Sequence, residues 1–112
     1  MMTEISRALL SSLFYATEFA DEKHEILKIE IDVEDFQIYF HKVMAHLYIH
    51  LKNIGEPVTF DVALIHLSKQ NVLDEMEFLN IMSATPFGTK NTVDGYLKIL
   101  RNDNKKSLIG RI

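Results

Sequence analysis

A regular apolar stripe followed by a glycine is the feature that most constrains the fold of this chain. Between residues 36 and 54, apolar side chains recur at steps of three and four: Phe36, Phe40, Val43, Met44, Leu47, Leu51 and Ile54. Such steps place side chains on one face of an α-helix, whereas a strand alternates at every second residue. Gly55 follows, where a left-handed residue commonly ends a helix. The pattern predicts a long amphipathic helix from residue 36 or 38 to about residue 53.

The remainder of the chain shows helical patterns as well. Similar spacing predicts helices over residues 3–17, 21–28, 59–70 and 74–84, and a last helix from residue 91 or 92 onward. The expected N-caps are Thr3, Asp21, Thr59 and Asp74, because their side-chain oxygens can accept free backbone N–H groups. Glu77 stands three residues after Asp74, which is capping-box spacing. The chain is therefore predicted to be all-α.

Four of the other predicted helices also have an expected buried face. In the helix predicted over residues 3–17, the face consists of Ile5, Ala8, Leu9, Ser12, Leu13 and Ala16, extended by Leu10 and Phe14. In the helices over residues 59–70 and 74–84, the faces are Phe60, Leu64 and Leu67, and Met76, Leu79 and Met82. In the last helix, the face is Val93, Tyr96, Leu97, Leu100 and Leu108. With 112 residues, of which 47% are hydrophobic, the chain can bury one core without staples. A single domain is expected.

Composition excludes several classes of function. The chain has no cysteine, so it has neither a disulfide framework nor a thiol nucleophile. No apolar run reaches the roughly 18 residues that span a bilayer, and the N-terminus lacks the layout of a secretory signal. We expect a cytoplasmic location and no association with a membrane.

Charge is unevenly distributed along the chain. Residues 1–97 hold 7 Lys/Arg against 15 Asp/Glu, a net charge of −8, whereas residues 98–112 have a net charge of +4. An acidic body repels phosphate backbones, so little direct DNA binding is expected. The basic end could touch nucleic acid, or it could equally be a helix terminus or the start of a protein interface.

Two histidines have the spacing of metal ligands. His46 and His50 are four residues apart and share a helix face. A zincin helix also needs a glutamate between its histidines, and here the intervening residues are Leu-Tyr-Ile. No third ligand is evident, because His41 lies about 140° away from His46 around the helix. Surface histidines are favoured over a metal site.

Other candidate sites also have simpler interpretations. Glu30, Asp32, Glu34 and Asp35 lack EF-hand spacing, so caps for the long central helix and a solvated acidic face are favoured over Ca²⁺ binding or acid–base chemistry. Docking to a basic partner stays open.

The chain has neither a P-loop nor a G-x-S-x-G elbow. As exposed aromatic and Met side chains often do, Tyr39, Tyr48 and Met76 could line a subunit contact.

Five stretches in order carry a resemblance to a known family. They are residues 6–13 (SRALLSSL), Asp35-Phe36 with His41 after it, Gly55-Glu56-Pro57-Val58, Phe78-Leu79, and Asn91 with Tyr96 and Ile99-Leu100-Arg101. With their matching gaps, they resemble the N-terminal domain of the bacterial replicative DNA helicase, the DnaB type. Two positions depart from the family pattern: Ser11 stands where Gly is common, and Thr59 stands where Asp is usual.

The resemblance implies a fold and a function. The expected fold is a compact orthogonal bundle of about six helices: a head over residues 1–100, with the last helix leading into a truncated helical hairpin at residues 101–112. In the family, hairpins pair N-terminal domains into dimers, and three dimers form a collar that binds primase. The implied role is a non-catalytic collar domain for hexamer assembly and primase binding during DNA replication. The ATP- and Mg-dependent motor is a separate C-terminal domain, and no cofactor is expected in this one.

The implied partners are other helicase N-terminal domains, primase and, as a further candidate, the helicase loader. The candidate residues for the subunit or primase interface are Lys105, Leu108, Ile109 and Ile112. Three alternatives stay open: the helicase-interacting C-terminal domain of a bacterial primase, which resembles the same fold; a small helical protein-interaction domain; and a metal-dependent enzyme using His46 and His50.

Overall fold

The computed structural model describes residues 2–19, 23–84 and 89–110, with side chains placed for residues 2–15, 24–84 and 89–104. Within these ranges the chain is helical and forms no strand. The elements are α1 (Met2–Phe19), α2 (Lys23–Leu27), the 3-10 helix η1 (Val33–Asp35), α3 (Tyr39–Ile54), α4 (Phe60–Lys69), α5 (Glu75–Met82) and α6 (Lys90–Gly110). The all-α prediction is confirmed.

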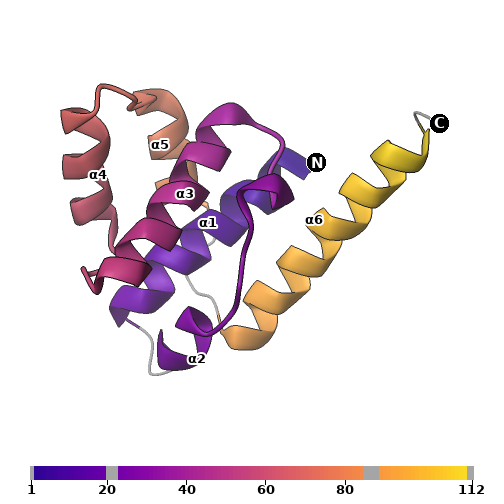
Figure 1. The fold of residues 1–112 in the computed structure, drawn as a ribbon, viewed down its shortest axis with the longest axis horizontal. Helices are drawn as coiled ribbons and strands as arrows, with labels where there is room; N and C mark the ends of the chain where they lie inside the picture. Colours follow the sequence, from indigo (N-terminus) through magenta and orange to yellow (C-terminus); the bar gives the residue numbers. More distant parts are fainter. Residues whose placement is uncertain (1, 20–22, 85–88, 111–112) are drawn as a thin grey trace.

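Helix α1 is the centre of the fold. It packs against α2, α3, α5 and α6, which lie around it in Figure 1. Four consecutive or nearly consecutive large side chains are fully buried: Leu9, Leu10, Leu13 and Phe14. A helix that buries more than one face needs neighbours on several sides, so the other helices pack around α1 rather than in two separate layers.

An aromatic cluster joins α4 to the rest of the body. The Phe60 ring, at the first residue of α4, lies 5.3 Å from Phe14, 4.6 Å from Tyr15 and 5.7 Å from Phe78, measured between ring centroids. The Tyr15 and Phe78 contacts are edge-to-face, a favoured geometry for aromatic pairs. Phe60 therefore links α4 to both α1 and α5.

Helix α6 lies along the body in its first half and projects beyond it in its second half (Figure 1). Its first half is anchored by Val93, Leu97 and Leu100, which are all buried. At 1.5 Å per residue, its 21 residues extend for about 30 Å. The last turns of α6 are thus carried away from the helices that hold the core.

The start of α3 differs from the prediction. Asp32 and Asp35 cap η1 instead of α3: Asp32 Oδ1 accepts the Glu34 N–H (3.0 Å), and Asp35 Oδ2 accepts the Asp32 N–H (2.8 Å). Phe36 follows in an extended conformation with its side chain buried, and α3 begins only at Tyr39. The prediction that Asp32 and Asp35 precede and cap α3 was wrong, because both carboxylates accept backbone N–H groups in the capping box of η1.

Several predicted buried faces were wrong at the edges of the bundle. Exposed fractions are 50% for Ile54, 42% for Leu64, 72% for Met76 and 56% for Leu79. In α5 the buried residues are Phe78 and Ile81. An eight-residue helix has about two turns, so its apolar spacing fits more than one face. The contact between Phe78 and Phe60 decides which face turns inward.

Tyr48 was wrongly expected at a subunit contact. It is fully buried, and its ring packs edge-to-face on Phe14 at 6.0 Å between centroids. Its hydroxyl has no hydrogen-bond partner among the described residues, and burial raises the pKa of the phenol. The other two contact candidates, Tyr39 and Met76, are exposed.

The predicted helix caps have different outcomes. Thr59 caps α4, since its Oγ1 accepts the Val62 N–H at 3.2 Å. Thr3 lies inside α1 and is not ahead of it. Asp74 accepts the Glu77 N–H at 3.1 Å, but the Glu77 carboxylate turns to α1 and α3 and does not complete a capping box. Asp21 lies outside the described residues.

Two glycines are expected to respond to alanine with opposite signs. Gly55 ends α3 with φ +74°, and a Cβ there would meet no atom within 4 Å, so only backbone strain opposes alanine. Gly55→Ala should lower the free energy of unfolding by about 1 kcal/mol. Gly95 lies within α6, and a Cβ there would also meet no atom within 4 Å. Gly95→Ala should therefore raise the free energy of unfolding by about 0.5–1 kcal/mol. Chemical denaturation measures both values, and effects of the same sign would contradict this account.

Candidate functional site

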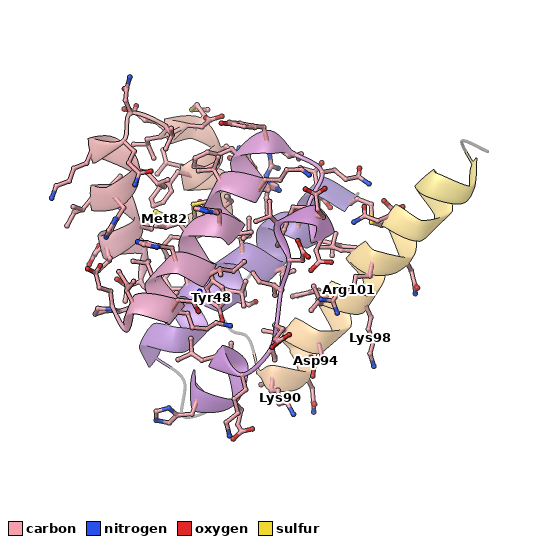
Figure 2. The ribbon with its side chains drawn as sticks, viewed as in Figure 1. Tyr48, Met82, Lys90, Asp94, Lys98 and Arg101 are labelled. Atoms are coloured by element: carbon pink, nitrogen blue, oxygen red, sulfur yellow. The ribbon has the colours of Figure 1, made fainter. Side chains whose placement is uncertain are left out.

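A polar clamp fastens α6 to the segment that precedes α3. Arg101 points from α6 toward this segment (Figure 2) and donates from Nε to Asp35 Oδ1 (3.0 Å) and from Nη2 to Asp35 Oδ2 (3.2 Å). Arg101 Nη2 also donates to the Glu30 carbonyl at 3.1 Å. A bidentate pair between a guanidinium and a carboxylate adds a defined geometry to the electrostatic attraction. The hydrogen bond to Asp35 also raises the pKa of the Arg101 guanidinium.

A second set of contacts extends the clamp by one turn of α6. Asn104 Nδ2 donates to the carbonyls of Glu34 (3.2 Å) and Asp35 (3.1 Å), and Asn104 Oδ1 accepts from Gln37 Nε2 at 2.6 Å. Asp35 is itself buried. Of the four carboxylates expected in caps and on a solvated acidic face, Glu30, Asp32 and Glu34 are exposed, whereas Asp35 is not.

Replacing Arg101 by methionine tests the clamp. The Arg101 side chain is 47% exposed, so solvent screening limits its ion pair; we expect Arg101→Met to lower the free energy of unfolding by about 1–2 kcal/mol. Amide hydrogen exchange in α6 should become faster near residue 101. Lys98→Met is the matched control, because Lys98 is exposed on the same helix and should change stability by less than about 0.5 kcal/mol. Equal effects of the two substitutions would argue against the clamp.

A buried hydrogen-bond network joins α1, α3 and α5. His41 is fully buried; its Nδ1 lies 2.5 Å from Ser6 Oγ, and its Nε2 lies 2.6 Å from Glu77 Oε2. Arg7 donates from Nε to Glu77 Oε2 (2.8 Å) and from Nη2 to Oε1 (2.7 Å). Four polar side chains from three helices therefore meet at one place.

The pKa shifts decide which atoms of this network carry protons. The hydrogen bond from Arg7 lowers the pKa of Glu77 to about 2, so Glu77 is an ionised acceptor at neutral pH. Burial lowers the pKa of His41 and keeps its ring neutral. His41 Nε2 must then carry the ring proton and donate a hydrogen bond to Glu77. It follows that Nδ1 is the acceptor and that the Ser6 hydroxyl donates to it.

This order of serine, histidine and carboxylate is also the order of a nucleophilic triad. A substrate could not reach this network. Ser6 is 4% exposed, and the cavity that Ser6 lines together with Asp35 and Asn104 has a volume of about 40 Å³. That volume is on the scale of a water molecule and not of an acyl substrate. The arrangement shown here holds three helices together.

His46 and His50 lie on the outer side of α3, along an open groove lined in part by α4. His66 of α4 has its ring centroid 6.4 Å from that of His50, but its Nε2 is 3.0 Å from Glu56 Oε2. Across the parts of the chain with placed side chains, no group of three or more His, Asp or Glu residues could hold a metal ion.

The predicted interface residues fall at the end of α6. Lys105, Leu108 and Ile109 belong to the part of α6 that projects beyond the body, and their side chains are outside the described set. Ile112 lies outside the described residues altogether. These four residues stay a prediction.

Sequence reasoning missed most of the buried network. Arg7 and Glu77 are 70 positions apart, and only folding brings them together. His41 gave a usable signal, since it follows Phe40 and precedes Met44 by three positions, next to the buried stripe. Arg101 and Asp35 were each noted as parts of familiar stretches, but their pairing was not foreseen.

No helix among the described residues is long and apolar enough to cross a membrane. No protein-family model, curated protein or solved structure matches the chain. The fold and its polar contacts define an all-α domain in which partly buried ion pairs tie distant helices together.

Proposed function

We propose that this chain is the non-catalytic N-terminal collar domain of a bacterial replicative DNA helicase of the DnaB type. In this role it takes part in hexamer assembly, binds primase and works in the cytoplasm. ATP and Mg would be used by a separate motor domain of the same protein.

The observation that carries the proposal is the ion pair between Asp35 and Arg101. These residues belong to two of the stretches that resemble the helicase family, and 66 positions separate them. A third stretch, residues 6–13, meets the Asp35–His41 stretch in the buried network, where Ser6 bonds to His41. If the likeness to the family were a coincidence, these stretches would have no reason to contact one another. In this fold they form contacts that connect helices distant in the chain.

The shape of α6 also supports the proposal. A collar domain of this family continues from its last helix into a hairpin that pairs with a second copy. Helix α6 is anchored as far as Arg101 and Asn104 and then projects from the body (Figure 1). The projecting turns contain Lys105, Leu108 and Ile109, which we propose for the subunit or primase interface.

A competition experiment tests this function. An excess of the folded domain, added to a reconstituted reaction with the cognate helicase and primase, is expected to lower primer synthesis, because free domain would take primase from the intact collar. The domain carrying Phe60→Ala, which should be close to unfolding, serves as the destabilised control. Primer synthesis that stays unchanged at a large excess of folded domain would contradict the proposal.

A further inference from the structure

An open groove runs along α3 on the side that faces the end of α4. Its volume is about 510 Å³, within the range of roughly 300–1,000 Å³ that is typical of ligand-binding clefts. Val43 and Leu47 of α3, with Leu67 of α4 and Val72 after it, provide apolar lining. Leu47 and Leu67 are core residues, 6% and 2% exposed, and Val43 and Val72 are partly buried beside them, so the groove floor is an apolar seat that is continuous with the core.

The polar residues along the groove are hydrogen-bond donors and lack carboxylates. Lys42, His46, His50 and Gln70 line it, and no Asp or Glu is among its described lining residues. The whole of α3 has no acidic residue, although the chain contains 16. On a body whose net charge is −8 over residues 1–97, this groove is a local exception, and it favours an acidic ligand.

The chain's own carboxylates already bind donors of this kind. Glu34, which is 80% exposed, reaches Lys42 Nζ at 3.1 Å at one end of the groove. Glu56 reaches His66 Nε2 at 3.0 Å on the neighbouring helix. His46 has no hydrogen-bond partner among the described residues, so its ring N–H can donate to a further carboxylate.

We propose that this groove binds an acidic amphipathic helix of a partner protein. Apolar side chains of the partner at i, i+3 or i+4, and i+7 would occupy the apolar seat, and its carboxylates would face Lys42, His46 and His50. From Tyr39 to His50 the groove wall rises by about 16 Å, so it would accept roughly three helical turns. The exposed Tyr39 ring would flank one end.

A helix fits this surface better than an extended peptide does. Strand addition needs an exposed sheet edge, and the described residues form no sheet. The groove instead follows one helix, and helix-in-groove binding places anchors at the same spacing as that helix. This inference rests on the groove alone and does not depend on the helicase proposal.

Fluorescence anisotropy with a labelled synthetic peptide tests the inference. The probe is a helical peptide of about 14 residues, with leucines at i, i+3, i+4 and i+7 spacing and glutamates elsewhere. We expect saturable binding to the intact chain. Two further peptides serve as controls: one with lysine in place of every glutamate, and one of the same composition with a scrambled order. Both should bind about tenfold more weakly or not at all.

Matched variants locate the binding surface. The double substitution His46→Glu and His50→Glu is expected to weaken binding of the acidic peptide about tenfold or more. Lys98→Glu makes the same change of −2 in formal charge on the outer side of α6 (Figure 2), and it should leave the affinity within about twofold. Far-UV circular dichroism checks that both variants are folded.

Three outcomes would overturn the inference. They are equal binding of the acidic and scrambled peptides, equal loss of affinity in the groove variant and in Lys98→Glu, and concentration-dependent self-association that the groove variant removes. The last result would assign the groove to a second copy of this chain instead of a partner helix.

Discussion

Phe60→Ala is expected to lower the free energy of unfolding by about 3–5 kcal/mol. Phe60 is 4% exposed and contacts the rings of Phe14, Tyr15 and Phe78. Removing it would leave a cavity at the junction of α1, α4 and α5 and would also abolish three aromatic contacts. A domain of this size is stable by roughly 5–15 kcal/mol, so the variant should be close to unfolding at physiological temperature.

The matched control for Phe60→Ala is Ile65→Ala on the same helix. Ile65 is 54% exposed, and its replacement should cost less than about 0.5 kcal/mol. Urea denaturation monitored by circular dichroism gives both values. If the two substitutions had similar effects, α4 would not be attached through its first residue, and the face assigned to it would be wrong.

Replacing Glu77 by glutamine is expected to lower the free energy of unfolding by about 2–3 kcal/mol at neutral pH. In the folded protein, the hydrogen bond from Arg7 lowers the pKa of Glu77 to about 2 from its ordinary value of 4.5. The unfolded chain therefore binds a proton at higher pH than the folded chain does. The stabilisation is complete above about pH 4.5 and is lost as the pH falls toward 2. Glutamine has no such titration.

The pH dependence distinguishes this ion pair from a general packing effect. The wild-type protein should lose stability in two ranges: first below about pH 6.5, because burial lowers the pKa of His41 from its ordinary 6.5, and then below about pH 4.5 through Glu77. Glu77→Gln should keep the first loss and lack the Glu77 share of the second. Denaturation curves at a series of pH values measure the difference. A gap between the two proteins that persists unchanged from neutral pH to pH 3 would contradict the assignment.

The sequence was most informative where periodicity and turn chemistry agreed. The central part of the α3 stripe, from Phe40 to Leu51, the left-handed Gly55 and the Thr59 cap were all predicted and are present. Prediction failed where a tertiary contact selected between local options. The inward face of α5 depends on Phe78 meeting Phe60, and periodicity within α5 gives no information about α4.

The polar contacts were harder to predict than the core. Asp35 is one of four carboxylates within six residues, and its partner Arg101 lies on α6, 66 positions along the chain. The network of Arg7, His41 and Glu77 likewise depends on three helices that are distant in the chain. Pattern reasoning assigned Asp35 and Glu77 to caps and foresaw none of these pairings, because it treats elements one at a time.

The most direct measurement of the proposed function is a titration of this domain with two candidates, the C-terminal domain of the cognate primase and the intact helicase, with mass followed by light scattering. The helicase-collar account predicts saturable binding to the primase domain, with a complex mass equal to the sum of the two partners. Binding to the helicase alone would favour the primase C-terminal alternative. Binding to neither candidate, by this chain or by a longer one that includes a complete hairpin, would contradict the account.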